Sequence, residues 1–310
     1  MNTQLFKYAL EIDRTRSITQ AAENLFMGQP NLSRAIKELE DSLGFEIFVR
    51  TSKGVAPTEK GNEFLMYAKN IILQLENMER ISDVETKNLQ TLSVSVPRAS
   101  YISAALTEFI DCLDDSFPID INYKETNAMQ SIADVNDGKH SFAIIRYRMH
   151  NESYFRDYLA EKNLLSETIW EFERIILTSS VNRYITNGII KDSDLERCVQ
   201  LVHGDTLVPY HKQYANRSGS DKMRKIRLYE RANQFELLTS MPDSYMWTAP
   251  VPQSFLEKYS LSMVRADRPG KIYRDVLIYP KDYKFSKLDR LFIDKVYEIK
   301  QKLIDMSYQK

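Results

Sequence analysis

Apolar positions recur at helical spacing in the first part of the chain. Between Leu5 and Ile12 they mark one side of a first helix. Ser17 is a good N-cap residue for a second helix of about two turns over "ITQAAENL". The link "FMGQ" then leads to a third helix, with Pro30 in its first turn and Gly44 as a left-handed cap at its end. The pattern predicts three short helices with tight connections.

The third helix has two unlike faces. Its inner face is apolar, with Leu32, Ile36, Leu39 and Leu43 at spacings of four, three and four. Its outer face is polar and carries Ser33, Arg34, Lys37 and Asp41. The inner face accounts for a small hydrophobic core, whereas the pattern gives the outer face no structural role.

After the third helix, the pattern predicts a short extended segment and then a long helix. Phe45, Ile47 and Val49 alternate with polar residues and precede a turn signal at Lys53-Gly54, which predicts a small hairpin. After it, an apolar seam repeats every four or three residues at Phe64, Ala68, Ile71, Leu75 and Met78. Such a seam suits a helix that pairs with a copy of itself, and it also suits a helix that packs on its own domain.

From Leu92 onward the pattern changes to strands separated by helical segments. The strand candidates are residues 92–96, 119–123, 142–147, 174–179, 199–204, 246–251 and 275–280. Helical candidates lie between several of them, and a last helix covers residues 287–306. This alternation predicts an α/β unit with parallel sheets, because crossover helices join parallel strands.

Composition narrows the class of protein. With 310 residues, of which 43% are hydrophobic and 27% charged, the chain is long enough for two or three folded units. The formal net charge of −1 gives no overall attraction to nucleic acid, so any such contact has to be local. Cys112 and Cys198 lie far apart, without a CxxC or a Cys/His cluster, which argues against a disulfide scaffold and a zinc site. No stretch resembles a membrane span or a signal peptide, so we expect a cytoplasmic protein with no membrane partner.

The helix-turn-helix outline gives the polar outer face a candidate chemistry. Arg34 and Lys37 can donate hydrogen bonds to guanine, and Gln29 or Asn31 can pair with adenine. Ser33 can bond to a base or a phosphate. The one grouping that looks like a basic patch comprises Arg34, Lys37, Arg50 and Lys53. The alternative is a helical hairpin whose polar face only meets water, and the helix pattern alone leaves both interpretations open.

Three segments carry a more specific pattern, namely "LFKYALEI", "SITQAAENLFMGQPNLSRAIKELEDSLGFEIFVRT" and "GVAPTEKG". In these segments residues 1–62 closely resemble the winged helix-turn-helix of LysR-type transcriptional regulators. The resemblance continues more weakly to the C-terminus. It implies an α/β protein with a helix-rich N-terminal winged helix-turn-helix and a C-terminal two-lobed effector domain, built like a periplasmic binding protein.

The resemblance implies contacts with double-stranded DNA. In that family the third helix enters the major groove and the wing lies along the adjacent backbone. Carried over by position, the residues implied at the groove are Gln29, Pro30, Ser33, Arg34 and Lys37. The residues implied at phosphates are Arg50, Thr51 and Lys53.

The resemblance also divides the chain into domains. It implies a DNA-binding domain over residues 1–62, a linker and dimerisation helix with a hinge over 57–90, and an effector-binding domain over 91–310. The two lobes of the last are implied at 91–163 with 268–310 (lobe I) and at 164–267 (lobe II). The apolar seam then belongs to a linker helix that pairs two chains, and we expect a homodimer that assembles further into a homotetramer.

A ligand cleft is expected between the lobes, because ligands of open α/β sheets bind at strand ends. The candidate cleft residues follow predicted strands or crossovers, and they are Ser100, Thr126, Asn127, Arg146 and His203. Each can equally be an ordinary cap, turn or surface residue. Many family members carry a glycine-rich junction where this chain has "MPDSYMWTAPVP", so Tyr245 or Trp247 is expected to fill part of the cleft.

Catalysis finds little support in the sequence. No GxSxG, HExxH or GxxxxGK[ST] motif is present, and the four histidines are too scattered for a metal centre. We therefore predict no catalytic residues, no cofactor and no metal site. The predicted function is that of a bacterial sequence-specific DNA-binding transcription regulator. Its two-lobed domain is predicted to sense a small-molecule effector and to change the spacing of the DNA-reading heads. The alternative is an α/β ligand-binding protein or enzyme with an N-terminal helical dimerisation module.

Overall fold

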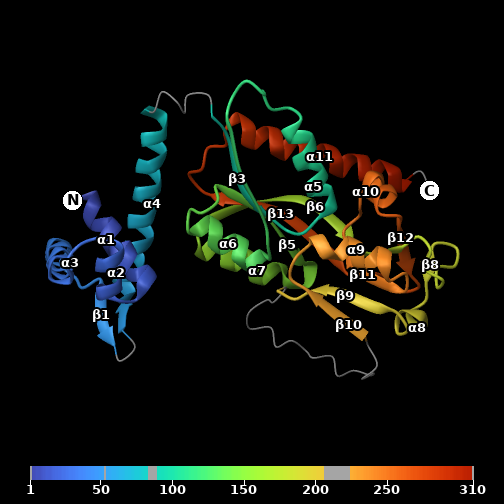
Figure 1. Ribbon diagram of the computed structural model, residues 1–310, viewed down its shortest axis with the longest axis horizontal. Helices are drawn as coiled ribbons and strands as arrows, with labels where there is room; N and C mark the ends of the chain where they lie inside the picture. The colour runs from blue at the N-terminus through green and yellow to red at the C-terminus, as the bar shows by residue number, and fades with distance from the viewer. Residues whose placement is uncertain (1, 52–53, 83–88, 206–223, 309–310) are drawn as a thin grey trace. The chain divides into compact units, whose positions relative to one another are not determined.

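The computed structural model describes residues 2–51, 54–82, 89–205 and 224–308 (Figure 1). The chain forms two compact units, residues 1–89 and 90–310. Each unit has its own hydrophobic core.

The N-terminal unit is a helix-turn-helix followed by a hairpin and a long helix. Its elements are α1 (Thr3–Thr15), α2 (Ile18–Asn24), α3 (Gln29–Leu43), β1 (Phe48–Thr51), β2 (Gly54–Pro57) and α4 (Glu59–Ser82). Its core is built from one face of each helix and from Ile47, and it includes Phe6, Ile12, Ala21, Leu32, Ile36 and Leu39. The predicted helices and hairpin of this unit are confirmed.

Local signals fix the ends of these helices. The hydroxyl of Ser17 accepts a hydrogen bond from the main-chain N–H of Gln20 at the start of α2. Pro30 lies in the first turn of α3, where its missing N–H costs nothing. Gly44 ends the same helix with a left-handed φ of 75°, a conformation that glycine adopts at little cost.

The hairpin is tied closely to the helices. The main-chain N–H of Val55 donates to the carbonyl of Arg16 at 3.0 Å, so the hairpin is attached to the turn between α1 and α2. Gly61, in the first turn of α4, passes so close to the carbonyl of Ile47 that a Cβ at this position would collide with it. The hairpin is therefore held against the helical core from two sides.

Helix α4 packs on its own domain through its first turns. Leu65, Ala68 and Ile72 are buried there. Tyr67 and Ile71 stay on the outside, with 55% and 43% of their surface exposed. Of the predicted seam, Ala68 thus belongs to the domain core and Ile71 does not, while the side chain of Met78 lies outside the described residues.

The C-terminal unit contains two sheets. The first sheet has the strand order β4-β3-β5-β13-β6. Its strands are β3 (Gln90–Val96), β4 (Ile119–Glu125), β5 (Phe142–Arg148), β6 (Leu164–Glu173) and β13 (Ile272–Pro280). Its helices are α5 (Ser100–Ile110), α6 (Ala128–Asn136), α7 (Glu152–Glu161), α11 (Lys287–Tyr308) and the short η2 (Met149–Asn151). We call this sheet with its helices the first lobe.

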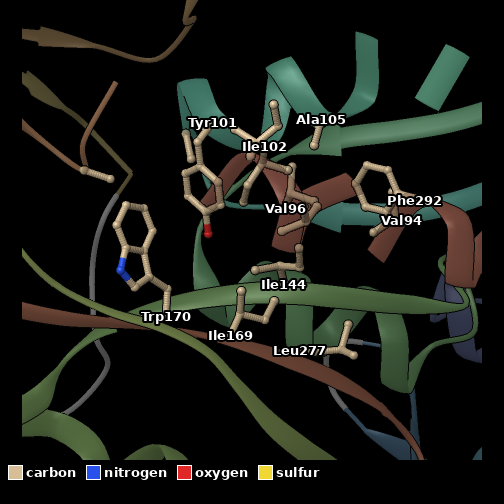
Figure 2. Packing of buried hydrophobic residues seen from close by; sticks show 14 of the residues in the cluster. Val94, Val96, Tyr101, Ile102, Ala105, Ile144, Ile169, Trp170, Leu277 and Phe292 are labelled. Atoms are coloured by element: carbon tan, nitrogen blue, oxygen red, sulfur yellow. The ribbon is translucent and has the colours of Figure 1, made fainter. Parts of the chain in front are cut away.

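Both faces of the first sheet are buried. On one face, Ile144 packs with residues of α5 and α11, including Ile102 and Phe292 (Figure 2). On the other face, Ala143 and Ile145 pack with residues of α6 and α7. Alternate residues of β5 thus enter two different cores, which explains why this strand reads as a continuous apolar run in the sequence.

The second sheet has the strand order β10-β9-β11-β7-β12-β8. Its strands are β7 (Ile175–Ser179), β8 (Ile189–Ile190), β9 (Val199–His203), β10 (Arg224–Leu228), β11 (Ser244–Thr248) and β12 (Leu261–Ala266). Its helices are α8 (Asp192–Leu195), α9 (Ala232–Ser240) and α10 (Gln253–Lys258). We call this sheet with its helices the second lobe. Together, the two units confirm the predicted fold class.

The prediction of parallel sheets is wrong in part. Strand β13 runs antiparallel to both β5 and β6, and β7 runs antiparallel to β11 and β12. The physical reason is that the chain leaves the first lobe by β6 and returns to it by β13, so β13 is not joined to its two neighbours by a helical crossover within one sheet. The strand predicted over residues 246–251 is also displaced, because β11 begins at Ser244 and ends at Thr248.

Candidate functional site

The outer face of α3 is open to solvent. Pro30, Arg34 and Lys37 are exposed, and Gln29 and Ser33 are half-buried. The inner face of the same helix is buried in the core of the N-terminal unit. The two-faced pattern seen in the sequence is therefore the arrangement in the fold.

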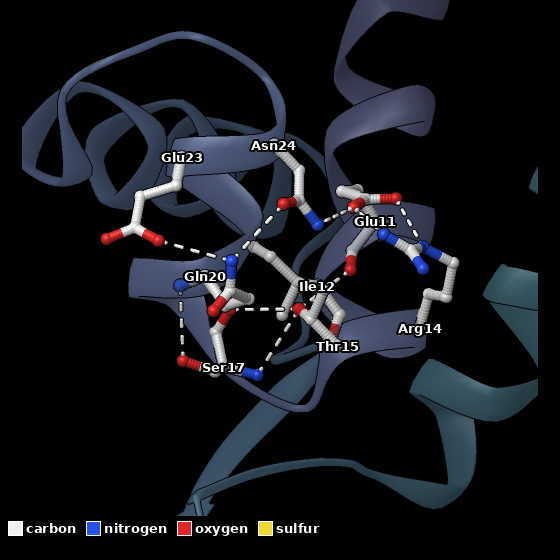
Figure 3. A network of polar contacts seen from close by, with 8 residues as sticks. All are labelled: Glu11, Ile12, Arg14, Thr15, Ser17, Gln20, Glu23 and Asn24. Atoms are coloured by element: carbon white, nitrogen blue, oxygen red, sulfur yellow. Dashed lines mark hydrogen bonds and ion pairs between the residues drawn. The ribbon is translucent and has the colours of Figure 1, made fainter.

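A polar network fixes the two helices that present α3. The carboxylate of Glu11 accepts hydrogen bonds from Arg14 in its own helix and from Asn24 of α2, the latter at 2.7 Å (Figure 3). The hydrogen bond from Arg14 lowers the pKa of Glu11, so this carboxylate is charged at neutral pH. The hydroxyl of Thr15 donates to the carbonyl of Ser17 at 2.9 Å, across the turn. These contacts join α1 to α2.

The hairpin places two of the predicted wing residues at its tip. Arg50 lies opposite Val55 and Thr51 opposite Gly54, and both Arg50 and Thr51 are exposed. The hydroxyl of Thr51 donates to the carbonyl of Gly54 at 3.1 Å. Lys53, the third predicted wing residue, lies outside the described residues.

The arginines of this unit, together with Lys37 on α3, fall into two groups. Arg14 pairs with Glu11 at 2.6 Å and Arg16 with Asp13 at 3.0 Å. In the described part of the chain, Arg34, Lys37 and Arg50 form no ion pair, although they are exposed. Their positive charges are thus available to a polyanion, whereas those of the first group are locally balanced.

A cavity of about 350 Å³ lies in the C-terminal unit and is lined by residues of both lobes. Its volume suits a small molecule. All five residues predicted for the cleft line this one cavity, namely Ser100, Thr126, Asn127, Arg146 and His203. The structure thus brings together residues that are far apart in the sequence, and their contacts with a ligand stay predictions.

Elements at the strand ends explain this convergence. Ser100 begins α5, just after β3, and Asn127 is the N-cap of α6, just after β4. His203 is the last residue of β9 in the second lobe. Arg146 lies within β5, where its guanidinium donates to both carboxylate oxygens of Asp275, at 2.7 and 2.6 Å.

The pair between Arg146 and Asp275 is a buried charge network. Asp275 is completely buried and also accepts a hydrogen bond from the hydroxyl of Tyr101 at 2.5 Å. Burial opposes the charge of Arg146, but Asp275 outweighs it and raises the pKa of the guanidinium. Arg146 is therefore committed to Asp275, and it faces the cavity as one half of an ion pair.

Two other ion pairs, unlike the pair of Arg146 and Asp275 within the first lobe, join the two lobes. Arg98 of the first lobe donates to both carboxylate oxygens of Asp205 of the second lobe, at 2.9 and 3.0 Å. Arg231 of the second lobe pairs with Glu125 of the first lobe and donates to Ser100 at 3.0 Å. Each lobe thus contributes one arginine and one carboxylate, so the two contacts hold the lobes together reciprocally.

The two aromatic residues expected in the cleft have different positions. Trp247 lines the cavity. Tyr245 does not, because it is buried in a cluster with Ile176 and Cys198 in the second lobe. Burial raises the pKa of the Cys198 thiol, and Cys112 is a free cysteine on the surface.

Sequence reasoning missed several lining residues, chiefly Arg98, Arg174, Gln200, Gln234 and Tyr273. Arg174 directly precedes β7, and its place as the first residue of the strand predicted over residues 174–179 was the one available signal. Across the described residues, no group of three or more His, Cys, Asp or Glu side chains could hold a metal ion. No helix in the described ranges is long and apolar enough to cross a membrane.

Comparison with known proteins identifies the N-terminal unit. Residues 3–62 match the family described as "Bacterial regulatory helix-turn-helix protein, lysR family". The chain is 36% identical over 123 residues to the HTH-type transcriptional regulator cbl of Escherichia coli, a match that covers 38% of each protein. It is 35% identical over 115 residues to the HTH-type transcriptional regulator CysB of Burkholderia cenocepacia, which covers 35% of this chain and 37% of that protein. The matched region spans less than half of the length of these relatives.

Solved structures share the fold over nearly the whole chain. ArgP of Mycobacterium tuberculosis has a TM-score of 0.57 at 15% identity, covering 96% of this chain and 97% of that one. LysG of Corynebacterium glutamicum, solved with bound effector Arg, has a TM-score of 0.56 at 14% identity, covering 97% and 99%. The two sequence relatives, cbl and CysB, are named as transcriptional regulators and not as enzymes. Residues 3–62 therefore form a helix-turn-helix domain of the LysR family, and the whole chain shares the fold of these solved regulators.

Proposed function

We propose that this chain is a cytoplasmic transcription regulator that binds specific DNA sequences and changes its DNA binding when a small-molecule effector occupies the C-terminal cavity. The observation that carries the proposal is the set of exposed basic side chains on α3 and the hairpin that form no ion pair with other described residues. They lie on a domain that matches the LysR helix-turn-helix family. No covalent chemistry is required.

The geometry supports a division of labour on the DNA. Gln29, Pro30, Ser33, Arg34 and Lys37 lie along one helix face, which suits entry into a major groove. Arg50 and Thr51 at the hairpin tip suit phosphate contacts, which fix position without reading sequence. By its place in the sequence, Lys53 belongs with them.

The effector part of the proposal rests on the cavity in the C-terminal unit. It is lined from both lobes, so a bound molecule would contact both and favour one arrangement of them. That LysG was solved with bound effector Arg supports the idea of an effector in such a fold. Through differential affinity for two arrangements, the effector would change the spacing of two DNA-reading heads.

Two reading heads require a dimer, for which we propose helix α4 within a linker region over residues 57–90. Tyr67 and Ile71 are apolar and exposed on α4, beside the buried Leu65 and Ala68. A second copy of the helix would cover them. Ile71→Glu should shift the protein towards monomer in sedimentation velocity, and an unchanged dimer would refute this interface. We propose that two such dimers form a homotetramer through the effector domains of residues 91–310.

DNA binding of the full chain tests the main proposal. Fluorescence anisotropy with DNA from upstream of its own gene, against random DNA of the same length, should show a specific affinity that falls steeply with salt. Arg34→Ala should reduce the preference for the specific DNA, because a bidentate base contact is worth about 1–3 kcal/mol. Lys7→Ala removes an exposed charge from α1 and serves as the matched control. No salt-dependent binding at low salt, or equal effects of the two variants, would contradict the proposal.

A further inference from the structure

The charged side chains that line the cavity of the C-terminal unit, among the described residues, are all positive. Among the described residues that line it there are four arginines, Arg98, Arg146, Arg148 and Arg174, and no Asp or Glu. Arg98 and Arg146 are balanced by Asp205 and Asp275, which lie behind the lining. The net charge of the site therefore depends on the other two arginines.

Arg174 is the unbalanced charge inside the cavity. Its guanidinium donates to the main-chain carbonyl of Trp247 and to the hydroxyl of Tyr273, the latter at 3.4 Å. It also lies over the ring of Tyr273, with its central carbon 4.9 Å from the ring centre. Within the described part of the chain it forms no ion pair. Three of its five N–H donors thus have no acceptor among these contacts.

The surroundings make this unbalanced charge unfavourable. Burial lowers the pKa of Arg174, which means that its environment disfavours the charged form. An arginine stays protonated even so, and a buried charge normally has a partner. Arg148, exposed at the end of β5, adds a second positive charge at the cavity wall and, within the described ranges, also forms no ion pair. An anion would supply the missing partner.

The rest of the lining is mostly uncharged. Met129, Phe155, Met246 and Trp247 offer apolar surface, and Asn127, Gln200 and Gln234 offer neutral polar groups. Such a wall favours a ligand with an apolar body rather than a bare inorganic ion.

We propose that the cavity binds a small organic anion, a carboxylate or related oxyanion on an apolar body, and that Arg174 binds the charged group. The geometry that supports this is a guanidinium that donates to Trp247 and Tyr273 and whose remaining donors have no acceptor among the described residues. The proposal rests on the effector site of the proposed function and names the chemical class of ligand for it.

Matched pairs of acids and amides test the charge requirement. Benzoate and benzamide, phenylacetate and phenylacetamide, and hexanoate and hexanamide have nearly the same shape within each pair and differ in charge. In thermal shift and isothermal titration with the full chain, at least one acid should raise the Tm at millimolar concentration while its amide does not. Amides that match their acids, or a panel in which no acid raises the Tm, would overturn the proposal.

Substitutions at Arg174 test the assignment to this residue. R174Q should raise the Kd of a binding acid by about tenfold to a hundredfold, the usual value of a charge-assisted hydrogen bond, and leave the amide unaffected. R174K keeps the charge and should retain part of the acid affinity. R265Q makes the same charge change on exposed β12 of the same lobe and should leave the Kd unchanged. If Arg174 only held Trp247 and Tyr273, R174Q would lower the Tm without changing the ratio of acid to amide affinity, and the proposal would fail.

A third measurement separates this inference from the proposed function. DNA affinity and footprint are recorded with and without the binding acid. An acid that binds through Arg174 but leaves the footprint unchanged would uphold the anion site and refute its role as an effector site. An amide that alters the footprint would leave the effector function standing and refute the anion class.

Discussion

Arginines have opposite surroundings in the two candidate sites of this protein. On α3 and the hairpin, Arg34 and Arg50 are exposed and, among the described residues, carry no counter-charge. Water solvates such charges cheaply, so they cost the fold little and stay available to DNA. In and beside the cavity, Arg98, Arg146 and the neighbouring Arg231 are largely buried and each has a carboxylate partner. Burial makes an unpaired charge costly, so Arg174, which forms no ion pair with the described residues, is the informative exception there.

The comparison implies that the loss of a counter-charge lowers the free energy of unfolding most where the ion pair is most deeply buried. Asp275→Asn should destabilise the C-terminal unit by about 3–5 kcal/mol, because it leaves Arg146 buried without its partner. Urea unfolding followed by tryptophan fluorescence measures this. Glu108→Gln, which breaks the exposed pair with Lys302, is the control and should cost at most about 1 kcal/mol. Equal losses of stability in the two variants would mean that burial does not determine how much each ion pair contributes.

Loss of an ion pair between the lobes should have an intermediate effect on the stability of the C-terminal unit. Glu125→Gln removes the carboxylate partner of Arg231 and should cost about 1.5–3 kcal/mol, the value of a hydrogen bond to a charged group. Asp243→Asn breaks the more exposed pair with Arg183 in the second lobe and provides the comparison. Hydrogen exchange should locate the loss for Glu125→Gln at the facing ends of α5 and α9. Exchange that rises only within one lobe would refute the joining role of this pair.

On the exposed side of the comparison, loss of a charge should affect binding and not folding. Arg50→Ala should leave the Tm unchanged and lower the affinity for specific and random DNA alike. If Arg50 contacts one phosphate, the slope of log affinity against log salt should fall by about 1. Anisotropy over a salt series measures this. A change in sequence preference would instead place Arg50 at a base.

The contrast between the regions also explains what the sequence could predict. Ser17, Pro30 and Gly44 act on the backbone within a few residues, so the helix-turn-helix follows from local signals. Strand β6 escaped notice because its buried and exposed positions do not alternate regularly. Its antiparallel pairing with β13 joins segments about a hundred residues apart, which no local pattern reveals.

The cavity shows the same limit. Ser100, Thr126 and Asn127 were found because residues at strand ends converge in open α/β sheets. Arg174 could not be singled out, because its lack of a partner becomes visible only when Asp275 and Asp205 are seen to bind other arginines. Pairing in the cavity is a property of the fold and not of any short segment.

The smallest expected effect concerns His203, a neutral group among these charges. Burial, and then the positive charges of Arg98 and Arg174, lower its pKa from 6.5 to about 4 in the folded protein, although Asp205 opposes them. Between these two values the unfolded chain takes up a proton that the folded chain does not, so His203 makes stability fall as the pH is lowered. At about pH 5.5 this loss of stability should amount to roughly 1 kcal/mol.

His203→Asn should remove that part of the pH dependence, measured by urea unfolding at about pH 5.5 and pH 8. His150→Asn on the surface is the control. Since an anion at Arg174 would offset the positive charges around His203, a bound acid should raise its pKa and reduce the same fall in stability. A pH dependence identical in His203→Asn and the parent chain would show that the arginines around the cavity do not act on this ring.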